Sequence, residues 1–448
     1  MSLATALQLA LEQSHAVRAS QLDRGLQRQE LAIAETEFEP KYSLGGQIER
    51  SAESRSSVST VAAGSTWRLA SGAQVELTRS QVLRGASGGQ QALQTVLRVV
   101  QPLLKGNASV ASLALENARL TDAVNRLQYR QFLSETVAAV VLAYHDAKQV
   151  DAQVELAVLS LQQSRQVLEV NEALYRAGRL AQRDLLQAEF DIAQNELALA
   201  QERNAADAVK RKLLELLGPV AAMAPTAQLE LGEGLPDRDV PDEPEHALLA
   251  QAQDSREDLE VAELAVNLAR TAITQARNEK LPQVDLVAGV QPVLKPELTD
   301  AGVQRSGYGV SIGLRFTATL DRAPLQLQLS RARVGLQKAE WFLQDLRSAV
   351  ANQVGSALRD LRFAKLQREL AGQALALAEQ RLGVELQKLK AGRSTTFELS
   401  AAQDALKRAQ AVSADAQLAV PRARVQLQRV TGQILAQWVP ELLPGSLP

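Results

Sequence analysis

The sequence predicts a mainly α-helical fold with a β-strand part, in which long helical hairpins are built twice along the chain. Three observations support this prediction. The 448 residues are rich in the amino acids of long helices, and apolar positions recur at helical spacing over long stretches. Two segments also share one pattern: LYRAGRLAQRDLLQAEF (174–190) and LKAGRSTTFELSAAQDA (389–405). Each has Ala-Gly-Arg, then an acidic residue six positions after the glycine.

The composition excludes several classes of protein. Apolar residues make up 46% and charged residues 22%, as in a folded chain, while 3% aromatic residues disfavour a thick globular core. A net charge of −2 gives no support for nucleic-acid binding. The chain has no cysteine, which excludes disulfides and thiolate metal sites. His15, His145 and His246 lie far apart, so we predict no metal site and no cofactor.

The chain shows no sequence signal for a membrane-spanning helix. No apolar run approaches the ~18 residues that such a helix requires. Residues 1–15 begin directly with a helical pattern instead of a basic segment and a cleavage site, so no signal peptide is predicted in this sequence.

The first half begins with a helix and continues into strands. Residues 3–38 are predicted to be helical, and Pro40 ends the helix. The composition of residues 42–101 then shifts to Ser, Gly, Thr and Val, which is typical of strands and turns. Candidate strands are 66–77 and 94–100. We expect exposed loops at 51–59 and 85–89, and the length of the region leaves open an additional hairpin at Ser71 and Gly72.

A long helical hairpin is predicted to follow. Pro102 opens a helical stretch to about residue 177 whose apolar residues step by threes and fours, as in coiled coils. A turn at Gly178 leads to a second helix that ends at Leu217. These elements form a first structural repeat, residues 1–217, and residues 218–245 form a linker.

The same order returns in a second repeat, residues 246–432. We expect a helix to about 279, strands in 283–320, a long helix from about 322, a turn at Gly392 and a shorter helix. The interval from Gly178 to Gly218 equals that from Gly392 to Gly432, which supports a tandem duplication. Residues 433–448 form a C-terminal tail.

Residues 308–317 carry the clearest strand pattern. In YGVSIGLRFT, apolar and polar or small residues alternate over ten positions. This is the length and pattern of a membrane β-strand, although a half-buried soluble sheet alternates in the same way. Gly309, Ser311 and Gly313 match a nucleophile elbow, but the unbroken alternation disfavours the sharp turn that an elbow requires. We therefore predict that the protein is not an enzyme.

The ordered, duplicated motifs resemble the TolC-type outer-membrane efflux protein family over nearly the whole chain. They are YRAGRLAQRDLLQAE, LKAGRSTTFELSAAQ, the closing ELLG and RVTG, VVQPLLKG, and SREDLEVAELAVNLAR. The resemblance implies a homotrimer in which four strands per protomer close a shared 12-stranded transmembrane β-barrel. It also implies a periplasmic α-helical barrel, with the linker and tail as a belt around it.

The resemblance further implies a passive exit channel of a tripartite efflux or type I secretion system. Its partners would be outer-membrane lipid, a periplasmic adaptor and an inner-membrane transporter. Two alternatives from the residues are a periplasmic adaptor and a soluble coiled-coil scaffold. An adaptor requires a lipoyl-like β module around one hairpin, whereas a scaffold leaves the alternation at 308–317 unexplained.

The resemblance assigns roles to the two turns. Gly178, Arg179, Gly392 and Arg393 would form adaptor-docking tips. Glu398, Asp184, Arg393 and Ser394 would form the periplasmic gate. The sequence departs from the family pattern, because Ala401 replaces a second acidic residue and Ser394 an expected arginine. The alternatives are that the glycines only end helices and that Glu398 only complements the helix dipole.

Overall fold

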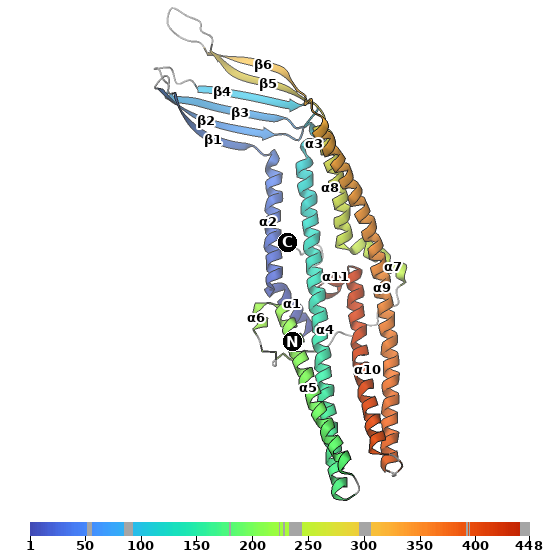
Figure 1. Ribbon diagram of the computed structural model, residues 1–448. Coiled ribbons are helices and arrows are strands. Elements are labelled where there is room, and N and C mark those ends of the chain that lie inside the picture. Colours follow the sequence, from blue (N-terminus) through green and yellow to red (C-terminus); the bar gives the residue numbers. More distant parts are fainter. Residues whose placement is uncertain are drawn as a thin grey trace, which may run out of the picture. The chain divides into compact units, whose positions relative to one another are not determined.

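The computed structural model describes residues 1–51, 56–84, 93–178, 181–223, 225–226, 229–232, 244–294, 306–390, 393 and 395–439 (Figure 1). The chain divides into two compact units. A helical unit comprises Met1–Asp23, Gln128–Leu259 and Asp345–Pro448. A sheet unit comprises Arg24–Leu127 and Glu260–Gln344.

The described part of the sheet unit contains one antiparallel sheet of six strands, in the order β1 to β6. The strands are β1 (Lys41–Ser51), β2 (Ser56–Arg68), β3 (Gln74–Arg84), β4 (Leu93–Pro102), β5 (Gln283–Leu294) and β6 (Ser306–Thr317). Neighbours along the chain are neighbours in the sheet, and β4 pairs with β5 across the long intervening segment. Both predicted strand regions therefore contribute to one sheet.

The strand count corrects a prediction. The resemblance implied four strands per chain, whereas the described residues form six. The additional hairpin that the sequence left open exists: β2 and β3 join through a tight turn in which Gly72 has a φ of +83°. The amide of Leu69 donates to the Ala73 carbonyl at 2.8 Å, which closes this turn. The expected loop 51–59 is also shorter than predicted, since β2 begins at Ser56; residues 85–89 lie outside the described residues.

The two faces of the sheet differ in polarity. Residues opposite each other in the registers share a face. One face is predominantly apolar and carries Tyr42, Leu44, Ile48, Val61, Leu77, Leu97, Leu286, Tyr308, Val310, Ile312, Leu314 and Phe316, all exposed in the single chain. The opposite face carries mainly polar and small residues, such as Gln47, Thr78 and Arg315. The alternation predicted at 308–317 is confirmed, and β6 runs unbroken through Ser311.

Helices lead into and out of the strands. They are α2 (His15–Glu35), the 3₁₀ turn η1 (Thr36–Phe38), α3 (Ala108–Ala111), α4 (Leu113–Arg176), α8 (Glu257–Glu279) and α9 (Ala323–Lys390). Within the sheet unit, Thr271 of α8 donates to Asn117 of α4 at 2.6 Å, and the Arg24 guanidinium donates to Asp122 at 2.5 Å. The long helix predicted from Pro102 begins later, because Pro102 ends β4.

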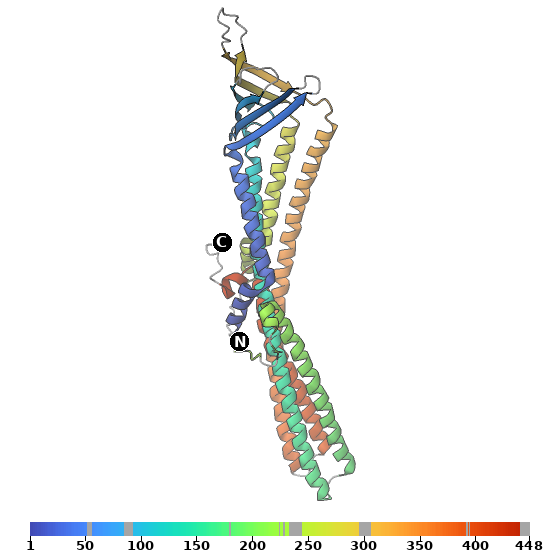
Figure 2. The same cartoon turned by 90° about the vertical axis from the view of Figure 1, so that its left-hand side faces the viewer.

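The helical unit contains the two hairpins. Its further helices are α1 (Leu3–Gln13), α5 (Gln182–Leu217), α6 (Pro219–Ala222), α7 (Glu245–Ser255), α10 (Thr396–Val430) and α11 (Ile434–Trp438). In Figures 1 and 2, α5 runs beside the part of α4 in this unit, and α10 runs beside the corresponding part of α9. The helix predicted over 3–38 is interrupted at Ser14, which separates α1 from α2.

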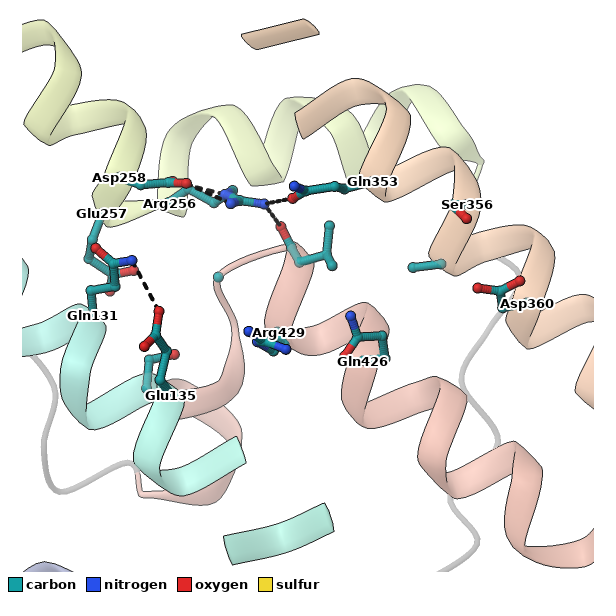
Figure 3. Close-up of a pocket in the computed structure, with 14 residues that line it drawn as sticks. Gln131, Glu135, Arg256, Glu257, Asp258, Gln353, Ser356, Asp360, Gln426 and Arg429 are labelled. Atoms are coloured by element: carbon teal, nitrogen blue, oxygen red, sulfur yellow. Dashed lines mark hydrogen bonds and ion pairs between the residues drawn. The ribbon is translucent and has the colours of Figure 1, made fainter. Parts of the chain in front are cut away.

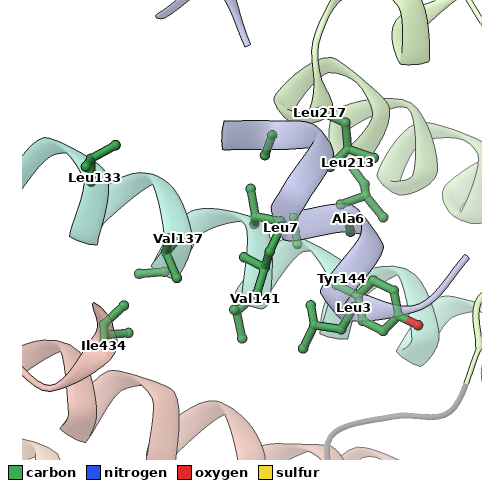
Figure 4. Close-up of a cluster of buried hydrophobic side chains, with 14 of the residues drawn as sticks. Leu3, Ala6, Leu7, Leu133, Val137, Val141, Tyr144, Leu213, Leu217 and Ile434 are labelled. Carbon is green, nitrogen blue, oxygen red and sulfur yellow. The ribbon is translucent and has the colours of Figure 1, made fainter. Parts of the chain in front are cut away.

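One apolar core joins the chain ends to the first hairpin. Leu3, Ala6 and Leu7 of α1 pack with residues of α4, the end of α5, and α11 (Figure 4). Tyr144 is fully buried in this core, and its hydroxyl donates to the Met1 carbonyl at 3.1 Å. The Gly232 amide donates to the same carbonyl at 2.8 Å, so part of the linker lies against the first residues. None of the helices in the described ranges has the length and apolar character of a membrane span.

Candidate functional site: the hairpin turns and the joint between helices

The first hairpin turn lies between α4 and α5. Gly178 has a φ of +70°, in the region that favours glycine, and its amide donates to the Tyr175 carbonyl at 2.9 Å. Asp184 lies half-buried in the first turn of α5, where its amide donates to the Ala181 carbonyl at 3.1 Å. An acidic side chain at this position is favoured by the helix dipole. Arg179 lies outside the described residues.

The second turn lies between α9 and α10. The Thr395 side chain accepts from the Glu398 amide at 3.3 Å, and the Glu398 carboxylate accepts from the Thr395 amide at 3.0 Å. This reciprocal pair is a capping box, which stabilises the start of α10. Arg393 is exposed, and its amide donates to the Lys388 carbonyl at 2.8 Å. Gly392 and Ser394 lie outside the described residues.

Sequence reasoning missed Thr395. The signal was present, since a threonine three positions before a glutamate at a helix start is the sequence signature of a capping box. The structure therefore shows the helix-start role of Glu398 directly. Its gate role stays a prediction, as do the docking roles of Gly178 and Arg393.

Polar contacts tie the two hairpins together. Asn195 of α5 accepts from Lys407 of α10 at 2.6 Å and donates to Ser164 of α4 at 2.6 Å. Farther along, Gln149 of α4 donates to Asp415 of α10 at 2.8 Å. Asp146 of α4 also pairs with Arg422 of α10. These contacts join both helices of the first hairpin, α4 and α5, to α10 of the second.

A polar cavity of about 390 Å³ lies where α8 begins, among α4, α9 and the end of α10 (Figure 3). The Arg256 guanidinium holds its wall together. It donates to both carboxylate oxygens of Asp258, at 2.9 and 2.6 Å, to Gln353 at 2.8 Å, and to the Val430 carbonyl at 3.2 Å. Arg256 thus joins three helices, which is a structural role that the sequence analysis did not assign.

Gly432, just after α10, allows the chain to pass close to the end of α7. Its φ is +74°, and a Cβ there would lie 2.8 Å from the Ser255 carbonyl oxygen. The first half repeats the arrangement, because a Cβ at Gly218 would lie 2.8 Å from the Gln13 carbonyl oxygen. In each half, the glycine that follows the hairpin therefore lies against the last residue of a short helix, α1 or α7. No larger residue can replace either glycine without a backbone shift.

His145 is the most perturbed titratable group of the helical unit's described part. It is buried on α4, and neither ring nitrogen has a hydrogen-bond partner. Burial lowers the pKa of His145 to about 4, against the opposing effect of the Asp146 carboxylate. Among the described residues, no cluster of three or more His, Asp or Glu side chains is arranged to hold a metal ion.

Comparison with known proteins extends the resemblance. The family described as Outer membrane efflux protein matches residues 6–219 and 248–433. Protein CyaE of Bordetella pertussis is 26% identical over 269 residues, which cover 60% of this chain. The aligned region spans 55% of that relative's length.

Solved structures show the same fold. The outer membrane protein VceC of Vibrio cholerae has a TM-score of 0.70 at 16% identity, over 96% of each chain. The CmeC outer membrane channel of Campylobacter jejuni has a TM-score of 0.71 at 12% identity, over 96% of this chain and 85% of that one. The MtrE outer membrane channel of Neisseria gonorrhoeae, in its open state, has a TM-score of 0.68 at 18% identity, over 97% of this chain and 89% of that one. Because the family pattern covers both halves, the chain belongs to the outer membrane efflux protein family.

Proposed function

We propose that this protein is the exit channel of a tripartite efflux or type I secretion system, and that three copies form the channel. Family membership places the chain in the outer membrane, with its long helices in the periplasm. Channels of this family are trimers that work with an adaptor and a pump. The finer proposal is that this chain forms a homotrimer, binds an adaptor through its hairpin turns and passes cargo without catalysis.

The observation that carries the proposal is the two-faced sheet. Its apolar face exposes large side chains on β1 and β6, which water would disfavour and lipid would accommodate. In the described chain, β1 and β6 each pair on one side only. Unpaired strand edges are not viable in lipid, so each edge requires another strand. Pairing of β6 with β1 of the next copy would satisfy both edges and surround a lumen with the polar face.

Assembly and conductance test the proposal together. The full chain, extracted from membranes in detergent, should have a mass of about three times 48.4 kDa. In planar bilayers it should conduct ions without an added energy source. A detergent-free, stable monomer with no conductance would overturn the proposal.

A further inference from the structure

We propose that Arg79, on the apolar face of the sheet, binds the phosphate group of a lipid in the outer leaflet of the membrane. The inference rests on the proposed function, because it requires this face of the sheet to contact lipid. The evidence comes from the residues opposite Arg79 in the register, from the polar side chains around it and from its place along β3.

Arg79 is a charged residue on an otherwise apolar face. It lies two positions from Leu77 on β3, so the two side chains share a face. Among the strand residues whose side chains the structure describes, no other charged residue lies on this face. Arg79 is exposed, and its guanidinium makes no hydrogen bond or ion pair with the described part of the chain. A charged group in lipid is costly unless it is paired, so Arg79 requires an anionic partner.

Two other arginines of the strands differ from Arg79 in what lies opposite them. Arg98 of β4 lies directly opposite Glu76 of β3, and Arg315 of β6 lies directly opposite Asp285 of β5. Both pairs lie on the polar face, where each arginine has a carboxylate on the neighbouring strand. Arg79 instead lies between an alanine of β2 and a threonine of β4, so its own sheet supplies no opposite charge in the register.

Polar side chains surround Arg79 on the same face. Thr95 of β4 lies directly opposite it, and Gln81 lies two positions farther along β3. Ser59 of β2 belongs to this face as well, because it lies opposite Ile48 of β1. All three are half-buried. Their hydroxyl and amide groups can donate hydrogen bonds to phosphate oxygens, so we call these three residues and Arg79 the Arg79 patch.

Apolar side chains flank the Arg79 patch. Leu77, Leu97 and Val61 lie on the same face of β3, β4 and β2, and each is exposed by 37 to 39%. A guanidinium forms paired hydrogen bonds with phosphate oxygens, while exposed apolar side chains favour contact with acyl chains. Together they fit a molecule that carries both groups, which is a phosphorylated lipid.

The Arg79 patch extends towards the end of the sheet that is remote from the helices. Strand β3 begins at Gln74, just after the β2–β3 turn, and Gly72 of that turn lies against Gly106, which precedes α3. Gln81 is therefore farther from the helices than Arg79. Because the long helices lie in the periplasm, this direction leads to the outer leaflet, and arginine side chains in membranes extend towards the head groups.

The apolar band is shorter over β3 than over β6. On β6 the residues of this face are apolar from Tyr308 to Phe316. On β3 they are apolar at Val75 and Leu77 and then become polar at Arg79 and Gln81. A bilayer thins locally beside a short apolar band. Lipid phosphates would therefore lie closer to Arg79 than to the middle of β6.

Lipid retention tests the site. The full chain is extracted in a non-ionic detergent, mixed with diphosphoryl lipid A as the probe and isolated again, and native mass spectrometry counts the lipids that stay bound. The parent should retain the probe, whereas Arg79→Gln should retain several-fold less. Arg98→Gln is the matched control, because it removes one positive charge from the adjacent strand on the opposite face, and it should retain as much as the parent. Loss of a charge from a lipid-contacting face does not oppose insertion, so Arg79→Gln should still assemble and conduct ions.

Two further measurements identify what Arg79 binds. Ala63→Glu places a carboxylate directly opposite Arg79, so it should lower retention by supplying an internal partner. Inorganic phosphate at the same concentration as the probe should displace little of it, because phosphate lacks the acyl chains that the apolar neighbours contact.

Equal retention by the parent and Arg79→Gln, or full displacement by inorganic phosphate, would overturn the lipid site while leaving the proposed channel intact. A parent that retains the probe through Arg79 but neither forms trimers nor conducts ions would support the site and contradict the proposed function.

Discussion

At the residue scale, His145 makes the helical unit sensitive to acid. The pKa of a free histidine is about 6.5, and burial lowers the pKa of His145 to about 4 in the folded chain. The unfolded chain therefore binds more protons between these two values, and stability falls as the pH falls from 6.5 towards 4. Of the named charged neighbours, Asp146 opposes this effect, whereas Arg422 and Lys148 reinforce it.

We expect His145→Leu to remove this part of the pH dependence. The free energy of unfolding of the parent should fall more steeply from pH 6.5 to 4 than that of the variant, by an amount on the order of 3 kcal/mol for a shift of this size. Denaturant titrations at several pH values measure the difference. Exposed His15→Leu is the control and should keep the parental slope; parallel curves for parent and His145→Leu would contradict the expectation.

Glu398 combines a visible helix-cap role with a proposed gate role, and two substitutions separate them. Glu398→Gln keeps an oxygen that can accept from the Thr395 amide but removes the charge, whereas Glu398→Ala removes both. If three copies of this carboxylate line the constriction, both variants should lose block by divalent cations. Only the alanine variant should also lose stability, by roughly 0.5–2 kcal/mol.

Single-channel recordings with divalent ions on the periplasmic side measure the block, and thermal unfolding measures the cap. If Glu398→Gln is blocked like the parent while Glu398→Ala is merely less stable, Glu398 only caps its helix. The constriction then lies elsewhere.

At the scale of elements, β6 allows a matched test of the two faces of the sheet. Ile312 is 75% exposed and lies on the apolar face, whereas the adjacent Ser311 lies on the opposite face and donates to the Gly289 carbonyl at 3.4 Å. Ile312→Arg should impair membrane insertion by about 2–4 kcal/mol if it lies near the midplane. Ser311→Arg should insert nearly as well as the parent. Membrane fractionation measures both, and equal insertion would argue against lipid contact on the apolar face.

The hairpin turns are the elements proposed to bind the adaptor. Arg393 is exposed beside the start of α10, and Arg179 is its sequence counterpart at the first turn. Reversing both charges, with Arg179→Glu and Arg393→Glu, should abolish export while leaving the trimer yield unchanged. As a control, Arg176→Glu changes a charge that already pairs with Glu172 on α4. Normal export by the double variant would remove the turns from the adaptor interface.

At the scale of the whole molecule, the six-stranded sheet affects the width of the channel. If three copies close one sheet, it would contain eighteen strands instead of the twelve that the resemblance implied. Because the diameter of a closed sheet grows roughly linearly with strand number, the opening would be about half as wide again.

Removing the β1–β2 hairpin tests the predicted width of the channel. The start of β1 and the β2–β3 turn lie at the same end of the strands, because Lys41 pairs with Thr66 near the end of β2. Joining Pro40 to Gln74 therefore deletes β1 and β2 without reversing the direction of the chain. The parent channel should admit larger neutral polymers from the outer side than this variant. An equal size limit for both channels would show that β1 and β2 do not enlarge the opening.

The sequence by itself determined the class of the fold. Helical spacing predicted the long helices, and glycines predicted the turns, because helical periodicity and left-handed backbone depend on local residues. The alternation at 308–317 predicted β6 in the same way. Duplicated motifs then predicted the family, which its match to both halves of the chain confirms. The tandem division at 217 and 246 and the roles of Asp184, Glu398 and Arg393 stay predictions.

Only the tertiary structure decided which distant residues meet. The sequence left open whether a β-hairpin forms at Ser71 and Gly72, because Ser- and Gly-rich stretches form strands or loops according to the neighbours that pair with them. Arg256 reaches Gln353 and Val430, far apart in sequence, and no local pattern signals that contact. Exposed apolar residues such as Phe190 of α5 and Phe363 of α9 look like ordinary core residues in sequence, since periodicity reveals that a helix face is apolar but not whether it is covered.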